Sequence, residues 1–302
     1  MHQNNPTAQG DALAVFSHVR PRLFGIAYRM LGSAAEAEDI LQDAWLRWQT
    51  TDRTAVLDPS AFLATVTTRL AINVTQSARS RKETYPGTWL PEPVSTSDDP
   101  HLGAERAEAL SLAVLLLMER LSPTERAAYI LREAFDYPYP DIAEILQLSE
   151  ANARQLVSRA RKHIAEERSI GSEMPDLIAR QSLLLTFVAA AQEGNLAALE
   201  KLFAEDVLTC ADGGGFVRAA RAPLTGRDRV THLIMAISSY FWTSIAVTLI
   251  EANGQPAALL SRGGDPVALA TIEASSDGIT HIFWHMRPSK LRAVAHLLPG
   301  SR

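Results

Sequence analysis

The chain has 302 residues, which is enough for two or more domains that each bury a core of their own. Its formal net charge of −5 excludes a uniformly basic nucleic-acid-binding protein, and its 47% of hydrophobic residues is typical of a soluble globular protein. The single cysteine, Cys210, excludes an internal disulfide and a zinc site built from several cysteines. The start of the chain is polar and no apolar run is long enough to span a membrane, so we expect a cytoplasmic protein without membrane contact.

Residues 12–82 have the pattern of an all-helical segment. Ser33 and Glu36 form a capping box that predicts a helix as far as Trp48. This helix places acidic residues three and four positions apart on one face, with apolar residues on the opposite side. The acidic face comprises Glu36, Asp39, Gln42 and Asp43. A stripe of this kind is either a solvated surface or a docking surface for a basic partner.

A second helix is predicted over residues 61–81, after Pro59 and Ser60. It opens a run, 69–82, that holds four basic residues and no acidic ones, which suits a phosphate backbone. The candidate nucleic-acid contacts in this run are Arg69, Asn73, Arg79, Arg81 and Lys82. Residues 85–104 then contain four prolines and several small polar residues, which predicts an extended linker.

Residues 105–168 are predicted to be helical again, and they contain a helix-turn-helix. Its first helix covers 137–146, the turn covers 147–149, and the second helix covers 150–162. Apolar residues recur at helical spacing in the second helix, so its polar and basic side chains face outward. These are side chains that contact phosphates and base edges in DNA, namely Asn152, Arg154, Gln155, Ser158, Arg159, Arg161 and Lys162.

The pattern changes after Gly171. Helices are predicted over 177–192 and 196–203, and strand-like runs separated by hairpin dipeptides follow from Phe241 onward. The expected strands are 242–252, 257–262, 267–275 and 279–287. Helices followed by antiparallel strands predict an α+β domain that is separate from the helical first half.

Several residues of this last domain could serve as acids or bases: Asp212, Asp228, His232, His281 and His285. His281 and His285 lie four apart on a predicted strand and would face one side, with Phe283 between them. Each is more simply interpreted as a structural residue. Three glycines follow Asp212, which predicts a tight turn, and Cys210 is most simply a core residue. We therefore expect no catalytic residues, no metal and no cofactor.

The order of acidic helix, basic helix, linker and helix-turn-helix resembles the extracytoplasmic-function (ECF) sigma factors of the σ70 family. Residues 37–45 are similar to the family's core-polymerase-binding motif, and 121–126 with the helix-turn-helix are similar to its −35-reading domain. The ECF41 subgroup, which carries a SnoaL-like extension, is indicated by three segments: Trp89-Leu90-Pro91-Glu92-Pro93, 149–157 and Asp212-Gly213-Gly214-Gly215. Residues 287–291, Arg-Pro-Ser-Lys-Leu, stand where relatives tend to have Asn-Pro-Asp-Lys-Leu.

The resemblance implies two all-α sigma domains, the second a helix-turn-helix, and a C-terminal α+β cone-shaped SnoaL-like (NTF2-like) domain. We name these parts region 2 (12–84), the linker (85–104), region 4 (105–170) and the C-terminal domain (173–302). The implied function is that of a sigma factor that binds core RNA polymerase and directs it to promoters, under control of its own C-terminal domain.

The resemblance also assigns the contacts. Glu36, Asp39, Gln42 and Asp43 would bind core RNA polymerase, on the β′ clamp helices, with the β subunit as a further partner. The candidate contacts of 69–82 would meet the −10 element of promoter DNA, and those of 152–161 would meet the −35 element. The regulatory contact between the linker and the C-terminal domain would involve Trp89, Pro91, Glu92, Asp212, Gly213, Gly214 and Gly215.

Two other interpretations stay open. An ordinary helix-turn-helix regulator with a small-molecule-sensing domain would not need the acidic face of 36–43. An enzyme of the polyketide-cyclase or isomerase type with attached DNA-binding domains would need turnover that depends on Asp212 or His281. The sequence also leaves open a small-molecule ligand in the C-terminal domain.

Overall fold

The computed structural model describes residues 6–96, 111–167 and 175–298, with the side chains of 6–10, 78–83 and 167 left out. The chain divides into two compact units. Of the described residues, one unit contains regions 2 and 4, and the other contains the C-terminal domain together with linker residues 84–96 and residues 111–113. Among the described residues, no helix is both long and apolar enough to cross a membrane.

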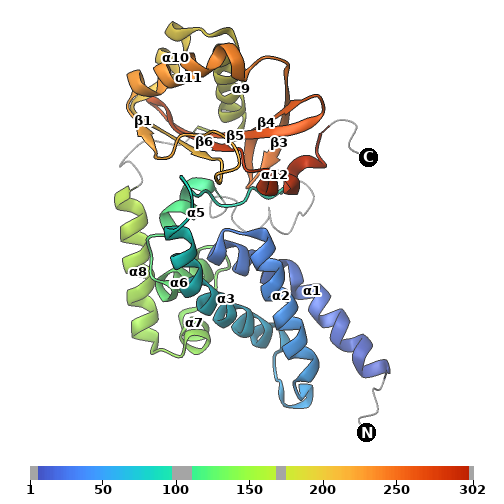
Figure 1. Ribbon diagram of the computed structural model, residues 1–302. Coiled ribbons are helices and arrows are strands. Elements are labelled where there is room, and N and C mark those ends of the chain that lie inside the picture. Colours follow the sequence, from blue (N-terminus) through green and yellow to red (C-terminus); the bar gives the residue numbers. More distant parts are fainter. Residues whose placement is uncertain (1–5, 97–110, 168–174, 299–302) are drawn as a thin grey trace. The chain divides into compact units, whose positions relative to one another are not determined.

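Region 2 is a bundle of three long helices in which α1 packs against both α2 and α3 (Figure 1). Its elements are α1 (Pro6–Leu31), α2 (Ala34–Thr50), the short 3₁₀ helix η1 (Arg53–Ala55) and α3 (Pro59–Glu83). The side chain of Ser33 caps α2 by accepting a hydrogen bond from the Glu36 amide, at 3.3 Å. Trp48 is buried on the opposite side of α2, and its indole Nε1 donates to the carbonyl oxygen of Ala12.

Region 4 contains α5 (Leu112–Met118), α6 (Pro123–Glu133), α7 (Tyr139–Leu146) and α8 (Glu150–Glu167). Ser122 and Glu125 form the reciprocal capping box at the start of α6. Gln147 ends α7 with a left-handed φ of 55°, and this turn directs the chain into α8. The helix-turn-helix expected from the sequence is therefore α7 and α8. Within the same unit, α1 and α3 of region 2 pack against α6, and α3 also packs against α7.

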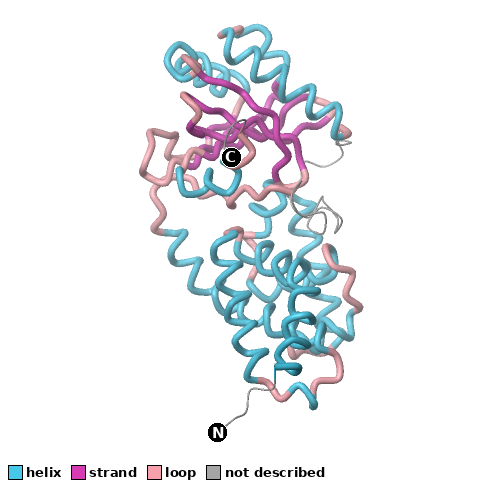
Figure 2. The backbone as a smooth tube through the Cα atoms, turned by 90° about the vertical axis from the view of Figure 1, so that its right-hand side faces the viewer, coloured by secondary structure: helices cyan, strands magenta, loops and turns pink. Residues whose placement is uncertain are grey.

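The C-terminal domain is a six-stranded mixed sheet with helices on both faces (Figures 1 and 2). The helices are α9 (Leu177–Glu193), α10 (Leu196–Leu202), α11 (Arg227–Phe241) and α12 (Pro288–Ala295). The strands are β1 (Phe203–Asp212), β2 (Leu224–Thr225), β3 (Ile245–Ala252), β4 (Gln255–Arg262), β5 (Asp265–Ser275) and β6 (Gly278–His285). They lie in the order β2-β1-β6-β5-β4-β3, in which only the β1–β6 pair is parallel.

The alternation of buried side chains along the strands makes two cores. Ala268, Ala270 and Ile272 of β5 face the large core beneath α9 and α11, which also contains Phe187 and Trp284. The intervening Leu269 faces the other side, where α12 covers a smaller core. The second face of the sheet carries the candidate site described below.

The fold class expected from the sequence is confirmed: two helical regions precede a separate α+β domain. The four expected strands correspond to β3–β6, with shifts of up to three residues at their ends. The sequence analysis did not assign β1, α11 or α12. Because β1 pairs in parallel with β6, about seventy residues later in the chain, no hairpin dipeptide marks its position.

Candidate linker clamp and promoter-reading surfaces

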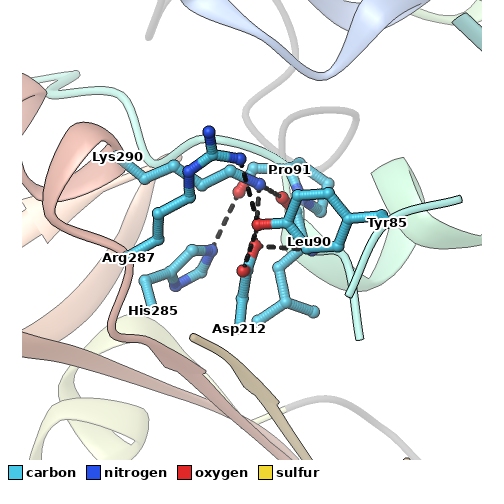
Figure 3. Close-up of polar contacts among 7 residues, drawn as sticks. All are labelled: Tyr85, Leu90, Pro91, Asp212, His285, Arg287 and Lys290. Atoms are coloured by element: carbon cyan, nitrogen blue, oxygen red, sulfur yellow. Dashed lines mark hydrogen bonds and ion pairs between the residues drawn. The ribbon is translucent and has the colours of Figure 1, made fainter. Parts of the chain in front are cut away.

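The linker is held against the C-terminal domain by the buried carboxylate of Asp212 (Figure 3). Its Oδ1 accepts a hydrogen bond from the Tyr85 hydroxyl at 2.6 Å, and its Oδ2 accepts one from the Leu90 amide at 3.0 Å. The Leu90 side chain is 0% exposed. One carboxylate therefore fixes both a linker side chain and the linker backbone.

Lys290 completes this contact at the carbonyl of the same residue, Leu90. Its Nζ lies 2.7 Å from Asp212 Oδ2 and also donates to the Leu90 carbonyl oxygen. The side chains of Lys290 and Asp212 are 3% and 0% exposed, so the ion pair is removed from water. Burial lowers the pKa of Lys290, whereas the neighbouring Asp212 charge opposes that shift. The ammonium also lies 4.7 Å from the centre of the Trp89 ring.

His285 holds the next residue of the linker. Its Nε2 donates to the Pro91 carbonyl oxygen at 2.8 Å (Figure 3). Burial, and then the nearby charge of Lys290, lower the pKa of His285 to about 4, so the ring is neutral at pH 7. We call Asp212, His285 and Lys290 the linker clamp. It binds three consecutive backbone groups of the linker: the amide and carbonyl of Leu90 and the carbonyl of Pro91.

The topology of the sheet brings these clamp residues together. Asp212 ends β1 and His285 ends β6, and the two are register partners because the strands are parallel. The Met286 amide then donates to the Asp212 carbonyl oxygen at 2.9 Å. Pro288 begins α12 directly afterwards and places Lys290 in its first turn. Residues far apart in the sequence thus converge at one edge of the fold.

The glycines after Asp212 allow a close approach to the linker. Gly214 has a φ of +56°, and a Cβ there would lie 2.8 Å from the Tyr85 hydroxyl and 2.7 Å from Arg287 Cδ. A Cβ on Gly215 would lie 3.1 Å from Pro86 Cγ. The Tyr85 hydroxyl also accepts from Arg287 at 3.2 Å, and burial with the Asp212 hydrogen bond raises the pKa of Tyr85 to about 12.

A second contact holds the end of the described linker at the β3–β4 hairpin turn. Val94 and Asn253 exchange two hydrogen bonds, from the Val94 amide to Asn253 Oδ1 at 3.2 Å and from the Asn253 amide to the Val94 carbonyl at 2.9 Å. The Thr96 hydroxyl donates to Glu251 at 2.5 Å and accepts from the Gly254 amide at 3.0 Å. The linker is therefore attached at two places.

The other acid and base candidates of this domain do not join the clamp. His281 stacks on Phe283 and is buried, which lowers its pKa. His232 is exposed, and its Nδ1 contacts the backbone carbonyl of Asp228 within α11. Cys210 is buried among apolar atoms, and that burial raises its pKa to about 11.

The acidic face predicted on α2 is at the surface of region 2. Asp39, Gln42 and Asp43 are exposed and Glu36 is half-buried, while Ile40 and Leu41 point into the core. Leu46 continues the exposed face one turn later and is itself 52% exposed.

The −10 candidates are placed unequally. Asn73 is exposed on α3, but the Arg69 guanidinium donates to the carbonyl oxygens of Ile145, at 2.9 Å, and Glu144, at 3.2 Å, at the end of α7. The side chains of Arg79, Arg81 and Lys82 lie outside the described residues.

The polar face of α8 is exposed along its length, as expected for a recognition helix. Asn152, Gln155 and Ser158 are exposed together with the arginines. Arg154 pairs with Glu150, Arg161 lies 2.7 Å from Glu133, and Arg159 lies 4.0 Å from Glu125. Arg159 has the longest of these contacts.

Some residues of the linker contact were not singled out by sequence reasoning. Tyr85 had no local signal, Arg287 and Lys290 were noted only as part of 287–291, and Asn253 was noted only as a hairpin residue, so none of them was assigned a contact with the linker. The predicted regulatory contact rested on the composition of 89–93 and 212–215.

The two helical segments match family models for sigma-70 region 2, over residues 15–82, and sigma-70 region 4, over residues 111–164. The chain is 40% identical over 245 residues to the ECF RNA polymerase sigma factor SigJ of Mycobacterium tuberculosis, covering 80% of this chain and 78% of that protein. It is 30% identical to the probable ECF sigma factor SigI of the same species, covering 99% and 100% of the two chains.

The crystal structure of M. tuberculosis SigJ is similar throughout. It superimposes with a TM-score of 0.74 at 30% sequence identity and covers 93% of this chain and 98% of the SigJ chain. The similarity includes both helical regions and the C-terminal domain. The chain therefore belongs to the ECF RNA polymerase sigma factors, whose partners are core RNA polymerase and promoter DNA.

Proposed function

We propose that the C-terminal domain regulates this sigma factor in cis by holding the linker between regions 2 and 4. The observation that carries the proposal is the linker clamp, in which a buried ion pair, Asp212–Lys290, is hydrogen-bonded to both sides of Leu90. A buried ion pair is costly unless its remaining hydrogen-bonding capacity is satisfied. The amide and the carbonyl of Leu90 satisfy part of that capacity, so the pair favours the state in which the linker is bound.

The linker sets how far apart regions 2 and 4 can lie. The thirteen residues 84–96 lie along the C-terminal domain, and release of this segment would supply up to about 45 Å of extended chain. A sigma factor must place its two DNA-binding regions on two separate promoter elements at once. A domain that binds or releases the linker thus shifts the population competent for initiation. A small molecule bound by the C-terminal domain would act by stabilising or loosening the same clamp.

The finer contacts with polymerase and promoter are also part of the proposal. The exposed face of α2, with Asp39, Gln42 and Asp43, is acidic and would dock on the β′ clamp helices of core polymerase. Asn73 and the basic end of α3 would meet the −10 element. The exposed residues of α8, among them Gln155 and Arg159, would enter the major groove of the −35 element.

We further propose that the C-terminal domain has no catalytic role. Asp212 and His285, the buried acid and base candidates, are hydrogen-bonded to the linker rather than directed at a substrate. Turnover of a small molecule by the full chain that is lost in His281→Ala would contradict this part of the proposal.

The test of cis regulation compares two glycine substitutions. Gly214→Ala introduces a Cβ that collides with Tyr85 and Arg287, whereas Gly263→Ala adds one in open space. Both glycines have left-handed φ values, +56° and +61°, so the backbone strain of the two variants is matched. Each variant is assayed with core polymerase by run-off transcription from the promoter upstream of its own gene.

We expect Gly214→Ala to change transcript yield several-fold at equal protein concentration, and Gly263→Ala to behave as the original chain. Equal yields from the two variants would contradict regulation through this contact.

A further inference from the structure

We infer that Tyr139 is a positioning residue for DNA binding, whose ring orients the Arg154 guanidinium for contact with a phosphate of the −35 element. Tyr139 is the first residue of α7, and Arg154 lies in the second turn of the recognition helix α8. The inference rests on the proposed docking of α8 in the −35 element. It adds the kind of contact that one cation of α8 makes and the residue that orients this cation.

The ring of Tyr139 contacts two guanidinium groups. The guanidinium carbon of Arg154 lies 4.4 Å from the ring centre, and that of Arg132 lies 5.0 Å from it. Both distances are within the range of attractive cation–π contacts. Arg132, near the end of α6, also donates to the Tyr137 carbonyl oxygen at 3.0 Å. One half-buried ring thus connects α6, α7 and α8.

The backbone around Tyr139 is restricted by a proline on each side. Pro138 is the N-cap of α7 in an extended conformation, and Pro140 follows Tyr139 in the first turn. Because a proline ring fixes its own φ, this segment has little conformational freedom to lose when DNA binds. The ring is therefore a rigid support for the guanidinium that packs on it.

The position of the ring indicates which part of the DNA Arg154 meets. In helix-turn-helix proteins the first helix crosses the sugar-phosphate backbone, while the second helix lies in the major groove. The Arg154 guanidinium packs against the first residue of the first helix, α7. It is therefore directed toward the backbone side of the groove, where the acceptor is a phosphate.

The same guanidinium is paired with Glu150 in the absence of DNA. Arg154 Nη2 donates to this carboxylate one turn earlier on α8, and the two side chains are 59% and 44% exposed. An exposed ion pair of this spacing contributes little to stability, and a carboxylate is repelled by a phosphate. We therefore expect Glu150 to leave when DNA binds. The Tyr139 ring does not repel a phosphate and keeps its contact with Arg154 in the complex.

This contact lowers the entropic cost of binding. A free arginine side chain loses rotamer freedom when it is held in one phosphate contact. Packing of Arg154 on the ring removes part of that freedom before DNA arrives, so less is lost on binding. Loss of the ring should then weaken DNA binding even though the ring itself touches no DNA.

The experiment is a double-mutant cycle between Tyr139 and Arg154. The full-length chain, assembled with core polymerase, binds a fluorescent duplex that carries the −35 element of the promoter upstream of its own gene. Affinity is measured over a series of salt concentrations. Tyr139→Leu removes the ring and Tyr139→Phe retains it, each alone and combined with Arg154→Ala. The matched control is Tyr240→Leu, at an exposed tyrosine of α11, and thermal unfolding verifies that each variant is folded.

We expect Tyr139→Leu to weaken binding about fivefold, as for loss of a partly exposed cation–π contact. Tyr139→Phe and Tyr240→Leu should bind as the parent chain does. In the Arg154→Ala background, Tyr139→Leu should cause no further loss, because the guanidinium that the ring orients is absent. Arg154→Ala itself should weaken binding to all duplex sequences alike and reduce the salt dependence by about one unit.

Equal losses from Tyr139→Leu with and without the Arg154 guanidinium would overturn the inference, since the ring would then only support the fold. A loss from Arg154→Ala confined to one base pair, at unchanged salt dependence, would overturn the phosphate contact. If Arg154→Ala binds as the parent while Arg159→Ala binds more weakly, the inference is wrong but the docking of α8 stands. If neither variant weakens binding, the proposed docking of α8 is wrong as well.

Discussion

The Asp212 carboxylate is bonded to Tyr85, Leu90 and Lys290, and each partner contributes differently to holding the linker. Lys290 neutralises its charge, the Leu90 amide connects it to the linker backbone, and Tyr85 orients it through a single hydroxyl. Removal of the charge would leave an ion buried without a counter-ion, whereas removal of the hydroxyl removes one hydrogen bond. Tyr85 is therefore the residue at which the clamp can be weakened without unfolding the domain.

We expect Tyr85→Phe to speed hydrogen exchange of the Leu90 amide by about tenfold, since a hydrogen bond to a charged group contributes about 1.5–3 kcal/mol. Exchange is measured on the full chain by NMR or mass spectrometry. Tyr240→Phe is the control, because Tyr240 is an exposed tyrosine of α11. Equal exchange rates in the two variants would show that the hydroxyl does not hold the linker.

His285 makes the stability of the folded chain depend on pH. Its pKa is about 4 in the folded chain against 6.5 in a free side chain, because burial and then Lys290 disfavour the imidazolium. Between these values the unfolded chain binds more protons than the folded chain. The free energy of unfolding should therefore fall as the pH drops from about 6.5 to about 4, by up to about 3 kcal/mol.

Urea unfolding at pH 7, 5.5 and 4.5 measures this effect in the parent chain and in His285→Gln. Glutamine retains an amide donor for Pro91 but does not titrate. Since the carboxylates titrate in both proteins, the difference between their pH slopes isolates His285. Parallel slopes would exclude it as the titrating group.

At the scale of single elements, α2 separates an exposed acidic face, the proposed polymerase-binding surface, from a face that packs in the core. Its acidic residues are exposed at intervals that leave Ile40 and Leu41 buried beneath them. A charge reversal on this face would therefore change the electrostatic attraction to a basic partner and leave the packing of Ile40 and Leu41 unchanged.

Asp39→Arg should therefore reduce the affinity for core polymerase by more than tenfold and leave binding to −35 duplex DNA unchanged. The control is Asp277→Arg, in the β5–β6 hairpin turn. An affinity of Asp39→Arg for core polymerase equal to that of the control would exclude this face from the polymerase interface.

The recognition helix α8 pairs several of its cations with acids of its own region. Arg154 and Arg161 are held by Glu150 and Glu133, whereas Arg159 is 4.0 Å from Glu125 and is the least constrained. A side chain with weak intramolecular contacts gives up less interaction energy when it turns toward DNA.

We expect Arg159→Ala to weaken binding to a −35 duplex by about 5–100-fold if it contacts a base edge. If it contacts a phosphate, the loss is similar for all sequences and the salt dependence falls by about one unit. Fluorescence anisotropy over a salt series distinguishes these outcomes. Arg229→Ala, on the exposed face of α11, is the control, and an affinity equal to that control would remove Arg159 from the interface.

At the scale of the whole molecule, the C-terminal domain follows region 4 in the chain and is also hydrogen-bonded to the linker. A chain ending at Ser172 lacks Asp212, His285, Lys290 and the hairpin turn at Asn253, so Leu90 loses the surface that buries it. The two sigma regions keep their own cores.

We expect this shortened chain to direct initiation with core polymerase, but with a transcript yield different from that of the full chain. Chymotrypsin should also cleave it faster after Trp89, which precedes Leu90, whereas Tyr85 precedes Pro86 and offers no cleavage site. Run-off transcription and limited proteolysis of the two chains make the comparison. Equal yields together with equal cleavage would show that the C-terminal domain exerts no control through the linker.

Local patterns in the sequence account for most of the helical part of the fold. The capping box at Ser33 and the turn over 147–149 predicted the starts of α2 and α8, because a helix start depends mainly on neighbouring residues. The hairpin at Asn253 was predicted for the same reason, since its φ of +54° suits asparagine in a two-residue turn. Motif resemblance then supplied the sigma-factor family, which the relatives confirm.

Only the tertiary structure decided which side chains meet. Tyr85, Asp212, His285 and Lys290 converge because β1 and β6 are parallel neighbours and α12 follows β6 at once, and parallel pairing across long separations leaves no local signal. Arg69, a DNA-contact candidate from its sequence context, donates to the carbonyls of Glu144 and Ile145, which the last turn of α7 presents to it. Helix starts and turns were thus determined by residues adjacent in the sequence. The partners of buried charged side chains were determined by the packing of segments that are far apart in the sequence.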